Sequence, residues 1–154
     1  MDALEARIKD INEDCQIIKI DKFIDDKNLI ELFKFTPDFF IDACDTIKTK
    51  LAIIDYCTKN NIKFISCMGT GNKLEPSKLE IIDIRKTVND PLARTIRKYV
   101  KDKRIKEKVT VLSSTEFPIK ISDRTPGSSA FVPSSAGLLI ASHVVKTFIN
   151  EEKI

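Results

Sequence analysis

Residues 39–50, FFIDACDTIKTK, place four charged side chains directly after an apolar run. Asp42 and Asp45 follow the apolar residues, and Lys48 and Lys50 come next. In open α/β sheets, ligands bind beyond the carboxyl ends of the strands. A carboxylate there can hold Mg²⁺, which prefers oxygen ligands, and an ammonium group can meet phosphate as a point charge. This spacing is compatible with a site for a metal-bound phosphate compound.

The same residues have a simpler structural interpretation. Asp45 can cap the helix that follows it by accepting hydrogen bonds from the backbone N–H groups at its start. Lys48 and Lys50 would then lie on a solvated helix face. Spacing alone favours this second interpretation.

Other motifs carry weaker signals. The GTG at residues 69–71 lacks the third glycine of a dinucleotide-binding loop and is predicted to form a turn. The run KDKRIKEK at residues 101–108 is typical of a solvated helix end, although it also suits contact with RNA phosphates. His143, the single histidine, lies in an apolar stretch and is predicted to be packed rather than catalytic.

The cysteines indicate no metal centre. None of the four forms a CxxC pair, so a tetrahedral zinc site has no support, and each thiol is expected to be a small buried residue. The absence of a recognisable signal peptide and the cysteine usage together predict a reducing, cytoplasmic setting. The net charge of +3 permits nucleic-acid binding without arguing for it.

Apolar periodicity predicts an α/β fold: a Rossmann-like, mostly parallel sheet flanked by helices, in a single domain over residues 1–154. The run 38–43 is expected to be a strand buried on both faces, and Asp90 and Pro91 are expected to begin a helix. The stretch 128–149 is expected to be a loop and a packed helix rather than a membrane span. The predicted helices cover residues 2–12, 25–34, 47–61, 89–102 and about 135–154, and the predicted strands 15–20, 38–43, 62–68, 78–84 and 108–114.

Several segments, in this order, resemble one family. They are RIKDIN, FIDACDTIKTKLAIIDYC, GTGNKLEPSKLEIIDIRKTVNDPLAR, SSTE and GSSAFVPSSAGLLIASHVV. The family is the ThiF/MoeB/HesA superfamily, which is related to the ubiquitin-activating enzymes. KTVNDPLAR with SSTE and GSSAFVP is most similar to its branch of tRNA threonylcarbamoyladenosine dehydratases.

The resemblance implies an ATP- and Mg²⁺-dependent enzyme that acts on tRNA. Such an enzyme adenylylates the carboxylate of threonylcarbamoyladenosine and closes it into a ring with release of AMP. By resemblance, Asp45 helps to hold Mg-ATP and is the metal ligand, Thr46 and Lys48 lie at the nucleotide, and Asp42 matches the first Asp of the family's DxxD motif. The resemblance also implies a homodimer and a link to a cysteine-desulfurase sulfur relay.

One departure is large. The glycine-rich ATP loop with which family members begin has no match here, so the chain is expected to be truncated at its N-terminal nucleotide-binding unit. The chain alone is therefore expected to bind ATP weakly and to be inactive, and its uncovered sheet edge to favour self-association. Two alternatives stay open: an adenylyltransferase that activates a ubiquitin-like sulfur carrier, and a non-catalytic tRNA-binding fragment.

Overall fold

The computed structural model describes residues 1–120 and 125–151. Its centre is a four-stranded sheet in the order β1-β2-β4-β3. The strands β1, β2 and β4 run parallel, and β3 pairs antiparallel with β4. The strands are β1 (Phe40–Asp42), β2 (Phe64–Cys67), β3 (Leu79–Asp83) and β4 (Thr110–Ser114). The mostly parallel α/β fold expected from the sequence is therefore confirmed.

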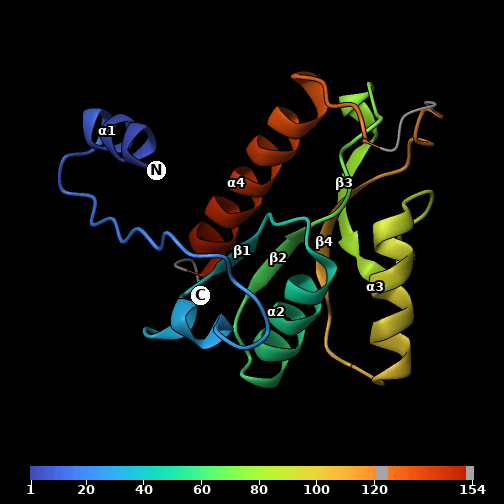
Figure 1. Cartoon of the computed structure of the whole chain (residues 1–154), viewed down its shortest axis with the longest axis horizontal. Helices are drawn as coiled ribbons and strands as arrows, with labels where there is room; N and C mark the ends of the chain where they lie inside the picture. Colours follow the sequence, from blue (N-terminus) through green and yellow to red (C-terminus); the bar gives the residue numbers. More distant parts are fainter. Residues whose placement is uncertain (121–124, 152–154) are drawn as a thin grey trace.

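Helices cover both faces of this sheet (Figure 1). On one face, α2 and α3 pack through a large apolar cluster that includes Ile54, Ile96 and Val111. On the other face, Ala136 and Ile140 of α4 pack against the strands. The helices are α1 (Asp2–Ile11), α2 (Ile47–Lys59), α3 (Pro91–Asp102) and α4 (Phe131–Glu151), with short 3₁₀ turns η1 (Leu29–Phe33), η2 (Pro76–Lys78) and η3 (Ile84–Lys86).

Three expectations about the first 43 residues need correction. Residues 15–20 form no strand: they connect α1, which lies apart from the body of the molecule, to η1, and they pair with none of the four described strands. The helix expected at 25–34 is reduced to the 3₁₀ turn η1. The strand β1 is not buried on both faces: it lies at the edge of the described sheet, and Ile41 is 48% exposed.

Two helices keep much of their apolar surface exposed. Helix α1 has no buried residue and lies apart from the body of the molecule (Figure 1). Helix α4 buries Val132, Ala136 and Ile140, whereas Leu138 is 73% exposed. Among the described helices, α4 is long and apolar enough to cross a membrane by length and composition only. It packs against the sheet through three buried residues, while other apolar residues such as Val145 stay exposed.

Candidate functional site

A pocket of about 450 Å³ lies where β1 and β2 end, at the carboxyl edge of the parallel strands. We call it the Asp45 pocket. Its walls come from the loop after β1, the loop after β2 and the start of α3, and Pro118 and Pro126 also line it. These segments meet because parallel strands bring their carboxyl ends to one edge, which is the usual ligand-binding edge of such sheets.

Behind this pocket lies a buried ion pair between Asp42 and Lys50. Lys50 Nζ is 2.9 Å from Asp42 Oδ2, and both side chains have no exposed surface. Lys50 also donates to Ser66 Oγ at 3.3 Å and to the Cys67 carbonyl oxygen at 2.8 Å. Ser66 donates to the same Asp42 oxygen. The pair therefore joins β1, β2 and α2 at the point where the pocket begins.

This arrangement changes the roles expected for Asp42 and Lys50. The interpretation of Lys50 as a solvated or phosphate-facing lysine is wrong, because its ammonium group is buried and has three protein acceptors. Asp42 Oδ1 accepts from the Cys44 backbone N–H at 3.1 Å, which fixes the first turn of the loop. Asp42 does not line the pocket. Its observed contacts position the loop that carries Asp45.

Asp45 is exposed and lines the pocket. The expectation that it caps α2 is wrong: the N-cap of this helix is Thr46, with no side-chain capping hydrogen bond. No hydrogen bond or ion pair within the described part of the chain uses the Asp45 carboxylate, so its oxygens face the pocket and solvent. Thr46 is half-buried, and Lys48 lies exposed in the first turn of α2, outside the pocket lining.

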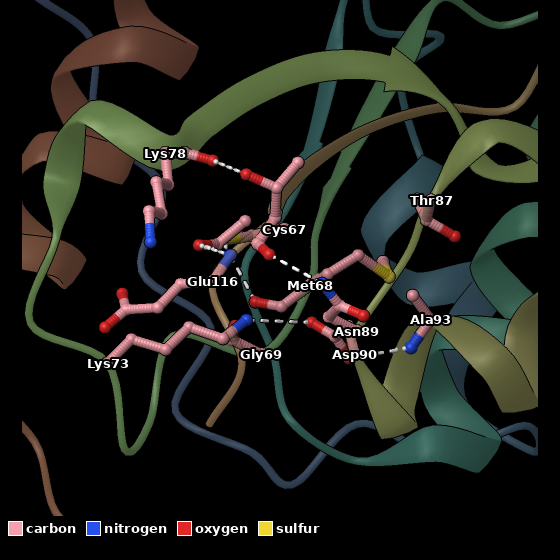
Figure 2. A network of polar contacts seen from close by, with 12 residues as sticks. Cys67, Met68, Gly69, Lys73, Lys78, Thr87, Asn89, Asp90, Ala93 and Glu116 are labelled. Atoms are coloured by element: carbon pink, nitrogen blue, oxygen red, sulfur yellow. Dashed lines mark hydrogen bonds and ion pairs between the residues drawn. The ribbon is translucent and has the colours of Figure 1, made fainter. Parts of the chain in front are cut away.

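The opposite wall contains a second buried ion pair, which sequence reasoning missed. Lys73 Nζ donates to the Gly69 carbonyl oxygen at 2.8 Å and lies 3.4 Å from Asp90 Oδ2 (Figure 2). Asp90 Oδ1 accepts from Ala93 N–H at 2.9 Å, which confirms the predicted cap of α3. Both charged side chains are 1% exposed. The pair ties the loop after β2 to the start of α3.

Gly69 allows this close approach. A Cβ atom at this position would lie 3.3 Å from Asp90 Oδ2. The GTG segment forms an irregular loop that leads into a turn at residues 71–72, as its sequence predicted.

Two polar residues hold the outer loops in place. Asn72 adopts a positive φ of 56°, and its Oδ1 accepts from Gly127 N–H at 2.6 Å. Glu116, from the SSTE segment, accepts the backbone N–H groups of Leu74 and Glu75. Hydrogen bonds from Glu75 and then Leu74 lower the pKa of Glu116, because they stabilise its ionised form. Both contacts anchor the loop after β2.

The thiols at the pocket are poor candidates for nucleophiles. Burial, followed by the neighbouring Asp42, raises the pKa of Cys44 to about 11. Burial also raises the pKa of Cys67. Both thiols therefore stay protonated near neutral pH. Within residues 1–120 and 125–151, no group of three or more His, Cys, Asp or Glu side chains is placed to hold a metal by itself.

A second pocket, of about 350 Å³, lies near the amino ends of β1 and β2 and includes His143. His143 packs edge-on against Phe39, with ring centroids 6.1 Å apart, and burial lowers its pKa. This agrees with the expected packed histidine. The Asp45 pocket is the better candidate site because it combines the ligand-binding edge with an exposed carboxylate.

The sequence and the fold are similar to those of known proteins. The chain is 36% identical over 171 aligned positions to tRNA threonylcarbamoyladenosine dehydratase of Bacillus subtilis, and the match covers all of this chain and 67% of that protein. It is 31% identical to the Escherichia coli protein of the same name, where the match covers 65% of this chain and 37% of that protein.

Solved structures of the E. coli dehydratase match nearly the whole chain. The complex with AMP superposes with a TM-score of 0.88 at 27% identity, covering 99% of this chain and 65% of that one. The complex with ATP superposes with a TM-score of 0.89 at 26% identity. The chain thus spans about two thirds of the solved chains it matches. The ThiF family profile matches residues 1–154, and the chain belongs to the ThiF family.

Proposed function

We propose that this chain provides the carboxylate-bearing half of an ATP-dependent tRNA-modifying site, which adenylylates threonylcarbamoyladenosine and closes it into a ring with release of AMP. The observation that carries the proposal is the exposed Asp45 carboxylate in a pocket at the carboxyl edge of β1 and β2. The family membership and the relatives' structures with ATP and AMP support it.

The residues present are better suited to hold the metal ion of Mg-ATP than to hold its phosphates. Asp45 offers the oxygen ligand that Mg²⁺ prefers. The one lysine on the described pocket wall is Lys73, which is buried and bonded to Gly69 and Asp90. Among the lining residues that the structure describes, no accessible cation is available for a triphosphate. We propose that Lys48 and Thr46 contact the nucleotide and that further cationic groups come from outside this chain, so that the isolated chain binds ATP weakly.

In this proposal, the chain's own residues position the reactants. The Asp42–Lys50 pair fixes the loop after β1 and so positions Asp45. Within the described residues, the Asp45 carboxylate makes no hydrogen bond or ion pair of its own. The Lys73–Asp90 pair fixes the facing wall. ATP would supply the adenylyl group that makes a carboxylate electrophilic, and Mg²⁺ would offset the charge of the departing pyrophosphate.

We also propose that the protein works in the cytoplasm as a homodimer. Exposed apolar side chains on α1 and α4 support self-association, including Leu4 at 69% and Leu138 at 73% exposed. Sedimentation velocity at rising concentration tests this, and a chain that stays monomeric at high concentration would contradict it.

A chimera tests the function. It joins this chain to the part of the B. subtilis relative that has no counterpart here. We expect it to convert threonylcarbamoyladenosine in tRNA with loss of one water, measured by mass spectrometry of the digested tRNA. Asp45→Asn should reduce the rate roughly a hundredfold or more, because a neutral amide is a poor Mg²⁺ ligand.

The matched control is Asp38→Asn, which alters another exposed aspartate near β1. It should leave the rate unchanged. A folded chimera that binds ATP but converts no tRNA, or an Asp45→Asn variant as active as the control, would refute the proposal.

A further inference from the structure

The charge of this protein is concentrated in one segment. Residues 85–108 contain 10 of the chain's 26 lysines and arginines and three of its 23 acidic residues, so the segment carries +7 while the rest of the chain carries −4. One of the three acids, Asp90, is buried in the pair with Lys73. Such a distribution steers a polyanion to one surface of the molecule rather than to the whole of it.

Four of these cations form one line along α3 and its end. Arg94, Arg97, Lys101 and Arg104 are called the α3 basic strip here. The first three follow one another at intervals of three and four residues, so they lie on one side of the helix, and Arg104 follows just after its end, where it shares a hollow with Arg97 and Lys101. At the helical rise, Arg94 to Lys101 span about 10 Å along the helix. The strip borders two hollows, of about 310 Å³ and 470 Å³, and Arg97 lines both.

The strip leads into the Asp45 pocket. Asp90 and Pro91 line both that pocket and the hollow that contains Arg94 and Arg97. A molecule lying along the strip would therefore reach the candidate site at the start of α3.

The contacts of these four cations leave their positive charges without a carboxylate partner in the described part of the chain. Arg94, Lys101 and Arg104 are exposed, and no carboxylate in the described part of the chain lies within salt-bridge distance of them. Arg97 Nη1 donates to the Thr87 carbonyl oxygen at 2.7 Å, which fixes its side chain without neutralising it. The neighbouring Arg85 is different, because it pairs with Asp83 at 2.8 Å.

Helix stability accounts for only part of this pattern. Cations near the end of a helix interact favourably with its dipole, which applies to Lys101 and Arg104. The dipole disfavours a cation near the start, where Arg94 lies in the turn that follows Pro91. The position of Arg94 therefore requires a different explanation.

We propose that the α3 basic strip binds the phosphate backbone of the RNA substrate and guides the target nucleotide into the Asp45 pocket. This inference rests on the proposed function, which makes tRNA the substrate. RNA supplies a row of phosphates that suits a row of cations, and proteins bind structured RNA largely through such backbone contacts.

The test is binding of a fluorescently labelled, unmodified tRNA transcript to the 154-residue chain, measured by anisotropy between 50 and 250 mM salt. Four phosphate contacts predict a slope of log K against log salt of roughly −3 to −4. Arg94→Gln with Lys101→Gln should weaken binding roughly tenfold at 100 mM salt and make the slope shallower by about two.

The matched control, Lys34→Gln with Lys59→Gln, removes the same charge from exposed positions off the strip. It should bind within about twofold of the unmodified chain. The inference is overturned if the control loses as much affinity as the strip variant, if the strip variant keeps the original slope, or if the chain binds no tRNA at 50 mM salt. The last result would favour an acidic protein as partner.

The conversion assay separates the two proposals. If a chimera carrying the strip substitutions binds and converts tRNA normally, the strip inference fails while the proposed function stands. If the strip governs binding but no conversion occurs, the proposed function fails and the RNA-binding surface stands.

Discussion

Lys50 Nζ lies 2.9 Å from Asp42 Oδ2, and neither side chain has any exposed surface. Removing one partner of such a pair leaves an uncompensated buried charge, so Lys50→Met should lower the free energy of unfolding by about 3–5 kcal/mol. Urea denaturation measures this change. Asp42→Asn combined with Lys50→Met should cost less than the sum of the single changes.

Lys48→Met is the control for this experiment, because Lys48 lies on the same helix but is exposed. It should change stability by less than about 0.5 kcal/mol. Equal losses for Lys48→Met and Lys50→Met would contradict the assigned role of the buried pair.

Asp90 combines two functions that substitutions can separate. Asp90→Ser keeps an acceptor for Ala93 N–H but leaves Lys73 without its buried partner. This change should lower the free energy of unfolding by about 3 kcal/mol. Asp90→Ala also removes the helix cap and should lower the free energy of unfolding by about 1 kcal/mol more. Thermal unfolding measures both. If serine restored full stability, the ion pair would contribute nothing.

Two thiols predict a pH dependence of alkylation: Cys57, the one cysteine that is fully buried as expected, and Cys44, which is only partly buried. The pKa is raised to about 11 for Cys44 and about 12 for Cys57, in both cases mainly by burial. Only the thiolate reacts, so both should resist iodoacetamide at pH 8 in the folded chain and react after unfolding. Because the folded state keeps these protons longer, their contribution to stability is present at neutral pH and is lost as the pH rises toward 11–12.

Peptide mapping by mass spectrometry follows each cysteine separately. Cys15, which is only partly buried and lies outside the core clusters, serves as the internal reference and should be modified first. Rapid modification of Cys57 at pH 8 without unfolding would show that its burial is wrongly assigned.

The sequence predicted the local features well. Apolar periodicity located α1, α2, α3 and the four strands of the described sheet, and Asp90 with Pro91 marked the start of α3. These features depend on neighbours within a few residues, which a single sequence displays. The strand prediction for residues 15–20 failed because a strand also needs backbone pairing with a neighbouring strand, and these residues pair with none of the four described strands.

The site was predicted less well for the same physical reason. The sequence shows that Lys50 and Lys73 are charged, but burial and pairing with Asp42 and Asp90 depend on contacts across 8 and 17 residues. One signal was available for Lys50: it lies three residues after Ile47 and four before Ile54, on the apolar side of α2. The structure places Asp45 at the pocket, while its nucleotide- and metal-binding role stays a prediction.

The central claim is that a carboxylate on tRNA is activated by adenylylation at the Asp45 pocket. In that reaction, a carboxylate oxygen forms a bond to the α-phosphorus of ATP and pyrophosphate leaves. The side-chain nitrogen then attacks the carbonyl carbon, loses its proton, and AMP departs with the former carboxylate oxygen.

The direct measurement uses tRNA whose threonylcarbamoyl carboxylate carries ¹⁸O, incubated with the active chimera and Mg-ATP. With both carboxylate oxygens labelled, we predict that each AMP formed contains one ¹⁸O atom, and that Asp45→Asn lowers its rate of formation roughly a hundredfold or more. Recovery of the label in inorganic phosphate, pyrophosphate or water, with unlabelled AMP, would contradict adenylylation and with it the proposed function of this site.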